Sequence, residues 1–188
     1  MAKDFSGNAG LPIGLRNNNP GNLRPGLLPW VGQTGSNGGF CTFKDCSFGI
    51  RALAVDLSNK ITSDGLDTIT DIISKYAPPS ENDTQAYINA VCDSTGWNAD
   101  DEIDFNSGNL ANLIQAIIEH ENGSASSQIS NADIIEGINL MPQSITDRVT
   151  SFFVNTPALA TASTVGVLAI VIVIILALFK PNVLKFKK

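Results

Sequence analysis

The chain has 188 residues, 43% hydrophobic and 16% charged, and this length suits one compact domain of about 100–150 residues with small additions. Its formal net charge is −6, and all 18 acidic residues lie between Asp4 and Asp147, whereas the last nine residues carry four lysines and no acid. Such an acidic body argues against nucleic acid as a partner, because phosphates require a surface of Lys and Arg.

The first part of the chain is rich in turn-forming residues. Residues 7–47 contain nine glycines and four prolines, which predicts loops with a small hairpin around 40–43. Apolar residues at helical spacing then predict helices over 48–61, 68–76, 84–96 and 109–120. The sequence therefore predicts a mainly helical α+β domain over residues 1–123.

A change of composition follows this domain. Residues 122–131 are rich in Gly, Ser and Asn, which is typical of a flexible linker. Ser130 and Asp133 then predict a capped start to a short amphipathic helix that Pro142 ends. We expect a linker and stalk over 124–156, in which 143–157 form either a helix at a membrane surface or a plain spacer.

The C-terminal part carries a long apolar run. Residues 158–179 are 22 consecutive uncharged residues, which as a helix would span about 33 Å, enough for the hydrocarbon core of a bilayer. The alternative, a buried core helix, needs a larger protein around it. The sequence therefore predicts a transmembrane helix over 157–180, a basic tail over 181–188, and a lipid bilayer as partner; no signal peptide is expected at the N-terminus.

The cysteines and the single histidine do not indicate a metal site. Cys41, Cys46, Cys92 and His120 match no familiar zinc spacing, so we predict neither metal nor cofactor. A local disulfide between Cys41 and Cys46 and a set of three reduced thiols are both compatible with the pattern.

The loop GLRNNNPGNLR over 14–24 is the strongest candidate for ligand binding. Its side-chain amides both donate and accept hydrogen bonds, as recognition of a sugar and its N-acetyl group requires. We therefore place Asn18, Asn19, Asn22 and Arg24 in a substrate site. The alternative is a loop whose asparagines cap its own turns.

Several motifs together resemble a known family. They are NNNPGNLR, Trp30-Val-Gly, a Phe-x-x-Phe run ending at Phe43, FGIRA, YAPP and ENDT followed by Tyr87-Ile. The pattern over 14–123 resembles phage and prophage virion proteins that include predicted peptidoglycan-degrading enzymes, and more distantly bacterial glucosaminidases. This resemblance implies a lysozyme-like or lytic-transglycosylase-like fold and peptidoglycan as substrate.

The resemblance also implies a catalytic acid. Residues 117–123 form an apolar helix that ends in Glu-Asn-Gly, which is similar to the Glu-Ser-Gly helix end of lysozyme-like hydrolases. No glutamate precedes the asparagine loop, so we predict a circularly permuted arrangement with Glu121 as general acid and Glu119 as reserve. The alternative is a pair of solvated acids at a helix end.

Other residues are predicted to bind substrate. Trp30, Phe43 and Tyr87 stack on sugar faces under this interpretation, although the same aromatics suit a core. Arg24 and Arg51 are candidates for binding substrate carboxylates; Arg51 has the alternative of pairing with Asp45 or Asp56. No second catalytic carboxylate is identifiable, and the resemblance implies a lytic transglycosylase, which needs only one.

The sequence thus predicts a membrane-anchored virion enzyme that cleaves the glycan strands of peptidoglycan during phage entry or exit. Its partners are peptidoglycan, a viral or host membrane and capsid proteins, and its location is the virion or, during assembly, the host inner membrane. One alternative is a non-catalytic virion membrane protein that binds the cell wall or links membrane to capsid. Another is a peptidoglycan endopeptidase.

Overall fold

The computed structural model describes residues 2–103 and 106–142. Helices dominate, with one two-stranded antiparallel sheet near the N-terminus. In chain order the elements are α1 (Ile13–Arg16), β1 (Gln33–Asn37), β2 (Phe40–Phe43), α2 (Cys46–Thr62), α3 (Ile69–Tyr76), α4 (Thr84–Thr95), α5 (Ser107–Asn122), the 3-10 helix η1 (Gly123–Gln128) and α6 (Asn131–Asn139). The predicted hairpin and the four predicted helices of the domain are therefore confirmed.

Side-chain caps explain where most helices begin. The residue before each of α2 to α6 accepts a hydrogen bond from a backbone N–H of the first turn, which satisfies a group that has no partner within the helix. These residues are Asp45, Thr68, Asp83, Asn106 and Ser130. At the other end of α4, Gly96 adopts the left-handed conformation (φ 74°) that ends a helix.

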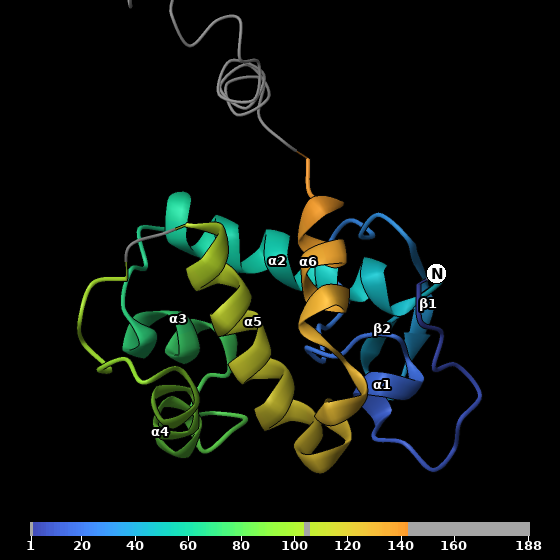
Figure 1. Ribbon diagram of the computed structural model, residues 1–188, viewed down its shortest axis with the longest axis horizontal. Coiled ribbons are helices and arrows are strands. Elements are labelled where there is room, and N and C mark those ends of the chain that lie inside the picture. Colours follow the sequence, from blue (N-terminus) through green and yellow to red (C-terminus); the bar gives the residue numbers. More distant parts are fainter. Residues whose placement is uncertain (1, 104–105, 143–188) are drawn as a thin grey trace, which may run out of the picture. The chain divides into compact units, whose positions relative to one another are not determined.

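Helix α5 runs through the middle of the domain (Figure 1), with α3 and α4 on one side and α1, α6 and the hairpin on the other. Its apolar face is almost completely buried, with Leu113, Ile114, Ile117 and Ile118 at most 1% exposed. Burial of such side chains contributes about 1.5–3 kcal/mol each. The position of the last turn of α5 is therefore set by the core.

Helix α6 belongs to this compact unit, which extends from Met1 to Met141. A Cβ atom built on Gly137 would lie 2.4 Å from Ile50 of α2, so the two helices approach closely at this glycine. Ser130 and Asp133 form the predicted capping box. The segment predicted as a linker and stalk from residue 124 is thus folded up to Met141, with η1 against α5 and α6 against α2.

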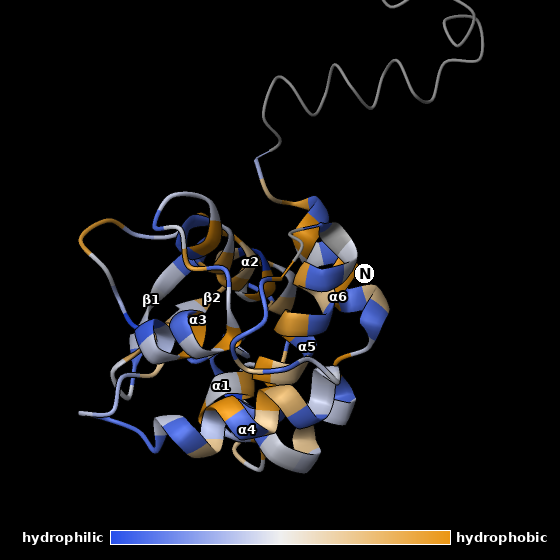
Figure 2. Cartoon of the chain, turned by 90° about the vertical axis from the view of Figure 1, so that its left-hand side faces the viewer, coloured by the Kyte–Doolittle hydropathy of each residue, from blue (hydrophilic) through white to orange (hydrophobic). Residues whose placement is uncertain are grey.

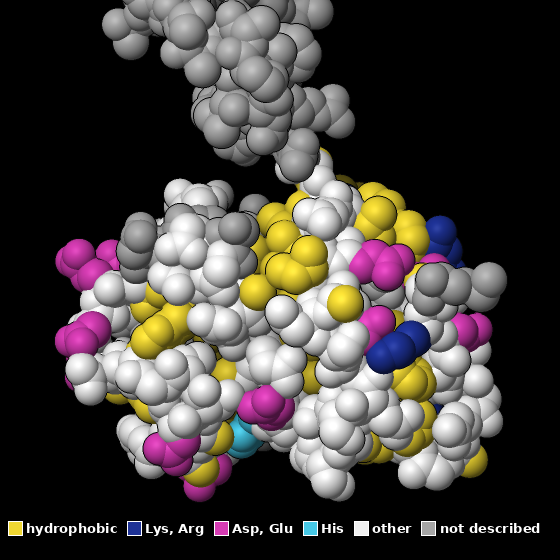
Figure 3. Space-filling view, viewed as in Figure 1, with side chains coloured by type: hydrophobic (Ala, Val, Ile, Leu, Met, Phe, Trp, Pro, Cys, Tyr) yellow, Lys and Arg dark blue, Asp and Glu magenta, His cyan; other side chains and the backbone are white. Residues whose placement is uncertain are grey.

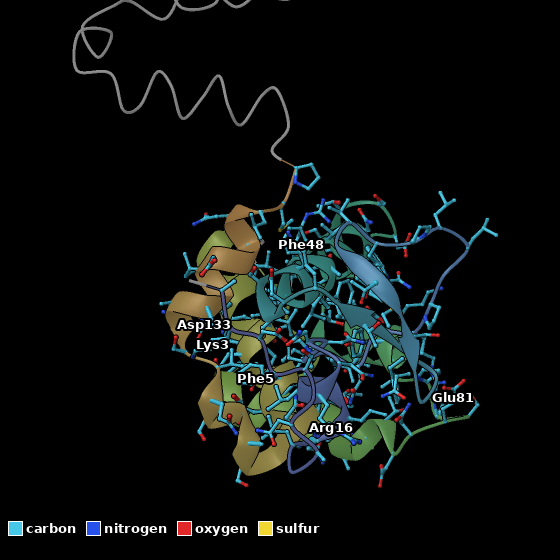
Figure 4. All side chains as sticks on the ribbon, turned by 90° about the vertical axis from the view of Figure 1, so that its right-hand side faces the viewer. Lys3, Phe5, Arg16, Phe48, Glu81 and Asp133 are labelled. Atoms are coloured by element: carbon cyan, nitrogen blue, oxygen red, sulfur yellow. The ribbon has the colours of Figure 1, made fainter. Side chains whose placement is uncertain are left out.

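The N-terminal segment forms polar contacts with both α6 and α2. Lys3 forms a 2.6 Å ion pair with Asp133 of α6, and its backbone carbonyl accepts a hydrogen bond from the N–H of Cys46 at the start of α2. Figure 4 shows Lys3 and Asp133 together, on the opposite side of this view from Glu81. The segment before α1 therefore has a defined place in the fold.

The predicted fold class, a lysozyme-like domain with a transmembrane helix, needs correction. Within the described residues no helix is long and apolar enough to cross a membrane; α2 has 17 residues and carries Arg51, Asp56 and Lys60. The labelled helices in Figure 2 carry both hydrophilic and hydrophobic residues, because each buries only one face. The described fold is a mixed one of six α-helices and a two-stranded sheet. The predicted helix over 157–180 and the segments 143–157 and 181–188 lie outside the described residues.

Candidate functional site

A cleft of about 510 Å³ opens beside the end of α5. Five parts of the chain form its walls: the loop over 21–30, the start of β2, the second half of α2, the end of α3 with the residues that follow it, and the last turn of α5. Its polar and aromatic lining residues are Asn22, Arg24, Trp30, Phe40, Asp56, Lys60, Tyr76, Glu81, Asn82 and Glu121.

Glu121 is held in the cleft by two hydrogen bonds. The side-chain amide of Asn22 donates to Oε2 at 2.6 Å, and the hydroxyl of Tyr87 donates to Oε1 at 2.8 Å. Glu121 is half-buried, so its carboxyl group has a fixed orientation and retains access to the cleft. The structure therefore brings together the predicted acid and two of the predicted binding residues.

The loop around Asn22 is tied directly to the end of α5. Asn122 donates one hydrogen bond to the carbonyl of Pro20 at 2.7 Å and another to the carbonyl of Ile118 at 2.9 Å. Asn22 itself adopts a left-handed conformation (φ 51°), which asparagine tolerates better than most residues. The distance between Asn22 and Glu121 is thus set by the backbone on both sides.

Gly14 explains a further part of this geometry. A Cβ atom at this position would lie 2.8 Å from the amide oxygens of both Asn22 and Asn122. In the described part of the chain both oxygens are buried without a hydrogen-bond partner. Only glycine leaves room for these two oxygens, so Gly14 is a supporting residue of the site that the sequence analysis missed.

Two tyrosines lie behind Glu121. Their rings are 6.3 Å apart in an edge-to-face arrangement, and Tyr76 donates a hydrogen bond to the carbonyl of Gly21. Burial raises the pKa of Tyr87, and the nearby Tyr76 and Glu121 raise it further. Burial likewise raises the pKa of Tyr76, with Glu121 and Asp56 adding to the effect. Both phenols therefore stay protonated and act as donors.

Two ion pairs complete the lining, and their acidic partners, Asp56 and Glu81, were not predicted as site residues from the sequence. Lys60 pairs with Asp56 at 2.7 Å on α2, where both side chains are at most 20% exposed. Arg24 pairs with Glu81 at 3.0 Å and is more than half exposed; its guanidinium also lies 5.3 Å from the ring centre of Phe40. The spacing of four residues on a predicted helix was the available signal for the first pair.

Asn18 and Asn19 do not reach the cleft. Both are buried, at 1% and 0% exposure. The amide of Asn19 bonds to the backbone of Leu23 and Cys41, and that of Asn18 bonds to Phe5, Asp4 and Phe43. The structure therefore does not bring these two predicted substrate ligands into the cleft, because the groups around them take up their hydrogen bonds. The alternative interpretation, asparagines that hold their own loop, describes these two residues.

The other predicted site residues divide between the cleft and the rest of the fold. Trp30 lines the cleft, whereas Phe43 is 3% exposed and belongs to the core. Arg51 donates a hydrogen bond to the carbonyl of Leu140 after α6 and is not among the residues that line the cleft. Glu119 accepts hydrogen bonds from Ser94 and Gln115 on the exposed surface of α5.

The three cysteines are free thiols, so Cys41 and Cys46 are not bridged. Burial, with a smaller contribution from the charge of Asp133, raises the pKa of Cys46 to about 12. Among the described residues no group of His, Cys, Asp and Glu is placed to hold a metal ion. In Figure 3 acidic side chains are spread over the visible face and basic ones are few, in keeping with the net charge of −6.

Comparison with known proteins identifies a phage relative. Over 116 residues the chain is 39% identical to Protein P5 of Pseudoalteromonas phage PM2, and the match covers 59% of this chain and 71% of Protein P5. The chain belongs to the family of Protein P5. No protein-family model matches it. The predicted relationship to phage proteins is therefore confirmed, whereas the one to lysozyme-like enzymes receives no support from these comparisons.

Proposed function

We propose that the chain is a phage-particle enzyme that cleaves the glycan strands of bacterial peptidoglycan, with Glu121 as the general acid. The observation that carries this proposal is the position of Glu121, whose carboxyl group lies in the wall of the cleft with Asn22 and Tyr87 bonded to its two oxygens. A general acid has to be held at a defined place within reach of the bond that it protonates.

The cleft has the size and lining that a saccharide requires. Its volume of about 510 Å³ lies within the usual range of about 300–1,000 Å³ for ligand sites. Trp30 and Phe40 offer aromatic surface, and Asn22 and Asn82 offer amide groups that both donate and accept hydrogen bonds. Membership of a phage protein family supports a role at the bacterial cell wall, the barrier that a phage has to open.

The surroundings of Glu121 also support its role in proton transfer. Because the raised pKa of Tyr87 keeps this phenol protonated, it acts as a donor that orients the carboxyl group. Each carboxyl oxygen has two lone pairs, so one oxygen can carry the transferable proton while the other retains its hydrogen bond. Within the proposal, Glu121 protonates the glycosidic oxygen as the bond to the anomeric carbon breaks.

Purified peptidoglycan sacculi provide the test. The full-length protein is expected to lower their turbidity and to release soluble muropeptides, which mass spectrometry identifies. Glu121→Gln keeps the shape of the side chain and removes the transferable proton, so cleavage is expected to fall by about 10²–10⁴-fold with unchanged thermal stability.

Glu119→Gln is the matched control, because Glu119 lies on the same helix two residues away and bonds to Ser94 and Gln115 outside the cleft. Its activity is expected to equal that of the wild type. Full activity in Glu121→Gln would contradict the proposal, as would a wild-type protein that binds sacculi without releasing fragments.

A further inference from the structure

The cleft contains a second carboxylate, Asp56 of α2. It lines the same cavity as Glu121 but comes from a different wall. Both of its oxygens accept hydrogen bonds from the ammonium group of Lys60, at 2.8 and 2.7 Å. The two side chains are 20% and 14% exposed, so this is a partly desolvated ion pair whose geometry is well defined, in contrast to the exposed pairs that contribute little.

A continuous set of contacts leads from Asp56 to Glu121. Lys60, which holds Asp56, lies 5.7 Å from the ring centre of Tyr76. Tyr76 meets Tyr87 edge to face, and Tyr87 donates its hydrogen bond to Glu121. The two tyrosines therefore connect the ion pair of Asp56 and Lys60 with Glu121. In agreement with these contacts, Tyr76 is influenced by both acids. Burial is the largest cause of its raised pKa, and the charges of Glu121 and Asp56 raise this pKa further.

The environments of the two acids suit different roles. Glu121 receives its hydrogen bonds from two neutral groups, whereas Asp56 faces a cation that stabilises a negative charge. Lys60 occupies one lone pair on each oxygen of Asp56, and each oxygen keeps a second one. Asp56 is therefore able to accept a hydrogen bond from a water molecule in the cleft while its ion pair stays intact.

We propose that Asp56 is the catalytic base of the site and that Lys60 is its positioning residue, so that the bond is broken by hydrolysis. This inference rests on the proposed cleavage of glycan strands. A pair of carboxyl groups in one cleft, one as acid and one as base, is the arrangement that direct hydrolysis of a glycosidic bond by water requires.

The reaction is balanced by one water molecule. Glu121 gives its proton to the glycosidic oxygen, and the bond between this oxygen and the anomeric carbon breaks. The water oxygen forms a new bond to the anomeric carbon and its proton passes to Asp56. Afterwards Asp56 releases a proton to solvent and Glu121 takes one up, so the net change is the addition of water across the bond. A transglycosylase would instead form an internal anhydro bond, without water.

Heavy-oxygen water distinguishes these outcomes. The full-length wild-type protein is incubated with purified sacculi in this solvent, and mass spectrometry of the muropeptides shows whether each new end carries solvent oxygen. We expect one solvent oxygen atom per cleaved bond. In Asp56→Asn, kcat is expected to fall by about 10²-fold or more with KM within about twofold.

Variants of neighbouring groups separate catalysis from folding. Lys60→Gln is expected to lower kcat and to change the pH profile of kcat. Lys60→Arg is expected to restore much of the rate, because the guanidinium group of arginine also forms an ion pair with Asp56. Asp64→Asn is the control, since Asp64 is exposed just after α2 and does not line the cleft; its rate is expected to be that of the wild type. Thermal melting checks that each variant is folded.

The possible results test the role of Asp56 separately from the proposed cleavage of glycan strands. Cleavage by the wild type that yields anhydro ends without solvent oxygen would overturn the role of Asp56 and leave the role of Glu121 intact. Wild-type kcat in a folded Asp56→Asn variant would do the same. A wild-type protein that cleaves no strand would overturn both proposals.

Discussion

The two halves of the loop over residues 17–24 use the same type of side chain for different purposes. In the first half, Asn18 and Asn19 are buried and bond to backbone groups of the loop, the N-terminal segment and β2. In the second half, Asn22 lines the cleft and bonds to Glu121. A side-chain amide can bond to backbone groups or to a carboxyl group, so its surroundings decide which of these partners it binds.

The halves also differ in what supports them. The first half is enclosed mainly by backbone groups, together with the carboxylate of Asp4, which accepts a hydrogen bond from Asn18, and Gly49 of α2, which lies directly against the carbonyl of Asn18. The second half rests on two buried tyrosines, because Tyr76 donates to Gly21 and Tyr87 donates to Glu121. This contrast predicts that the first half governs stability and the second half governs activity.

The largest effect on stability is expected for Gly49→Ala. The added Cβ atom would lie 1.9 Å from the carbonyl oxygen of Asn18, and because this is backbone the loop or α2 has to move. We expect a loss of about 3 kcal/mol or more in the free energy of unfolding, measured by urea denaturation. Gly35→Ala is the control, because its Cβ meets only ordinary contact at 3.5 Å. A change below about 1 kcal/mol in Gly49→Ala would contradict this close packing.

The comparison is most direct between Asn19→Ala and Asn22→Ala. Removal of Asn19 leaves buried backbone groups of Leu23 and Cys41 without their partner, which should cost about 2 kcal/mol of stability. Removal of Asn22 frees the carboxyl group of Glu121 and should lower cleavage by about 10²-fold, with a smaller stability loss of about 1 kcal/mol, because Ala tolerates the left-handed conformation at this position less well than Asn. Urea denaturation and the sacculus assay measure the two quantities. Equal stability losses in both variants would remove the distinction between the halves.

A different kind of effect, absent at neutral pH, is a loss of stability at alkaline pH. Burial raises the pKa of Tyr76 and Tyr87 above 10.0 and that of Cys46 from 9.0 to about 12. The folded state therefore binds protons that the unfolded state releases, so stability is complete below about pH 9 and falls as pH rises, by about 1.4 kcal/mol per pH unit for each group.

Thermal melting between pH 8 and 11 would measure this slope, and Tyr87→Phe should make it shallower by about the contribution of one group. Because the side-chain amide of Asn19 bonds to backbone groups of Leu23 and Cys41, the Asn19→Ala variant should show the same slope as the wild type. A melting temperature independent of pH over this range would show that the phenols beneath the second half titrate normally.

The sequence by itself determined the local structure of the domain. Helical spacing of apolar residues located α2 to α5, and Ser130 with Asp133 located the start of α6, because caps and amphipathic periods are properties of a few neighbouring residues. The same reasoning placed Glu121 at the end of an apolar helix. Its position in the cleft is one part of the predicted site that the structure contains.

Only the tertiary structure decided which polar side chains reach that cleft. Asn19 and Asn22 are three residues apart and chemically identical, yet one lies among backbone groups of β2 and the other beside α5. Asp56 joins Glu121 because α2 and α5 form two walls of one cavity, a contact between positions far apart in the chain. Such contacts depend on how the helices pack around α5, and no local pattern of residues records that packing.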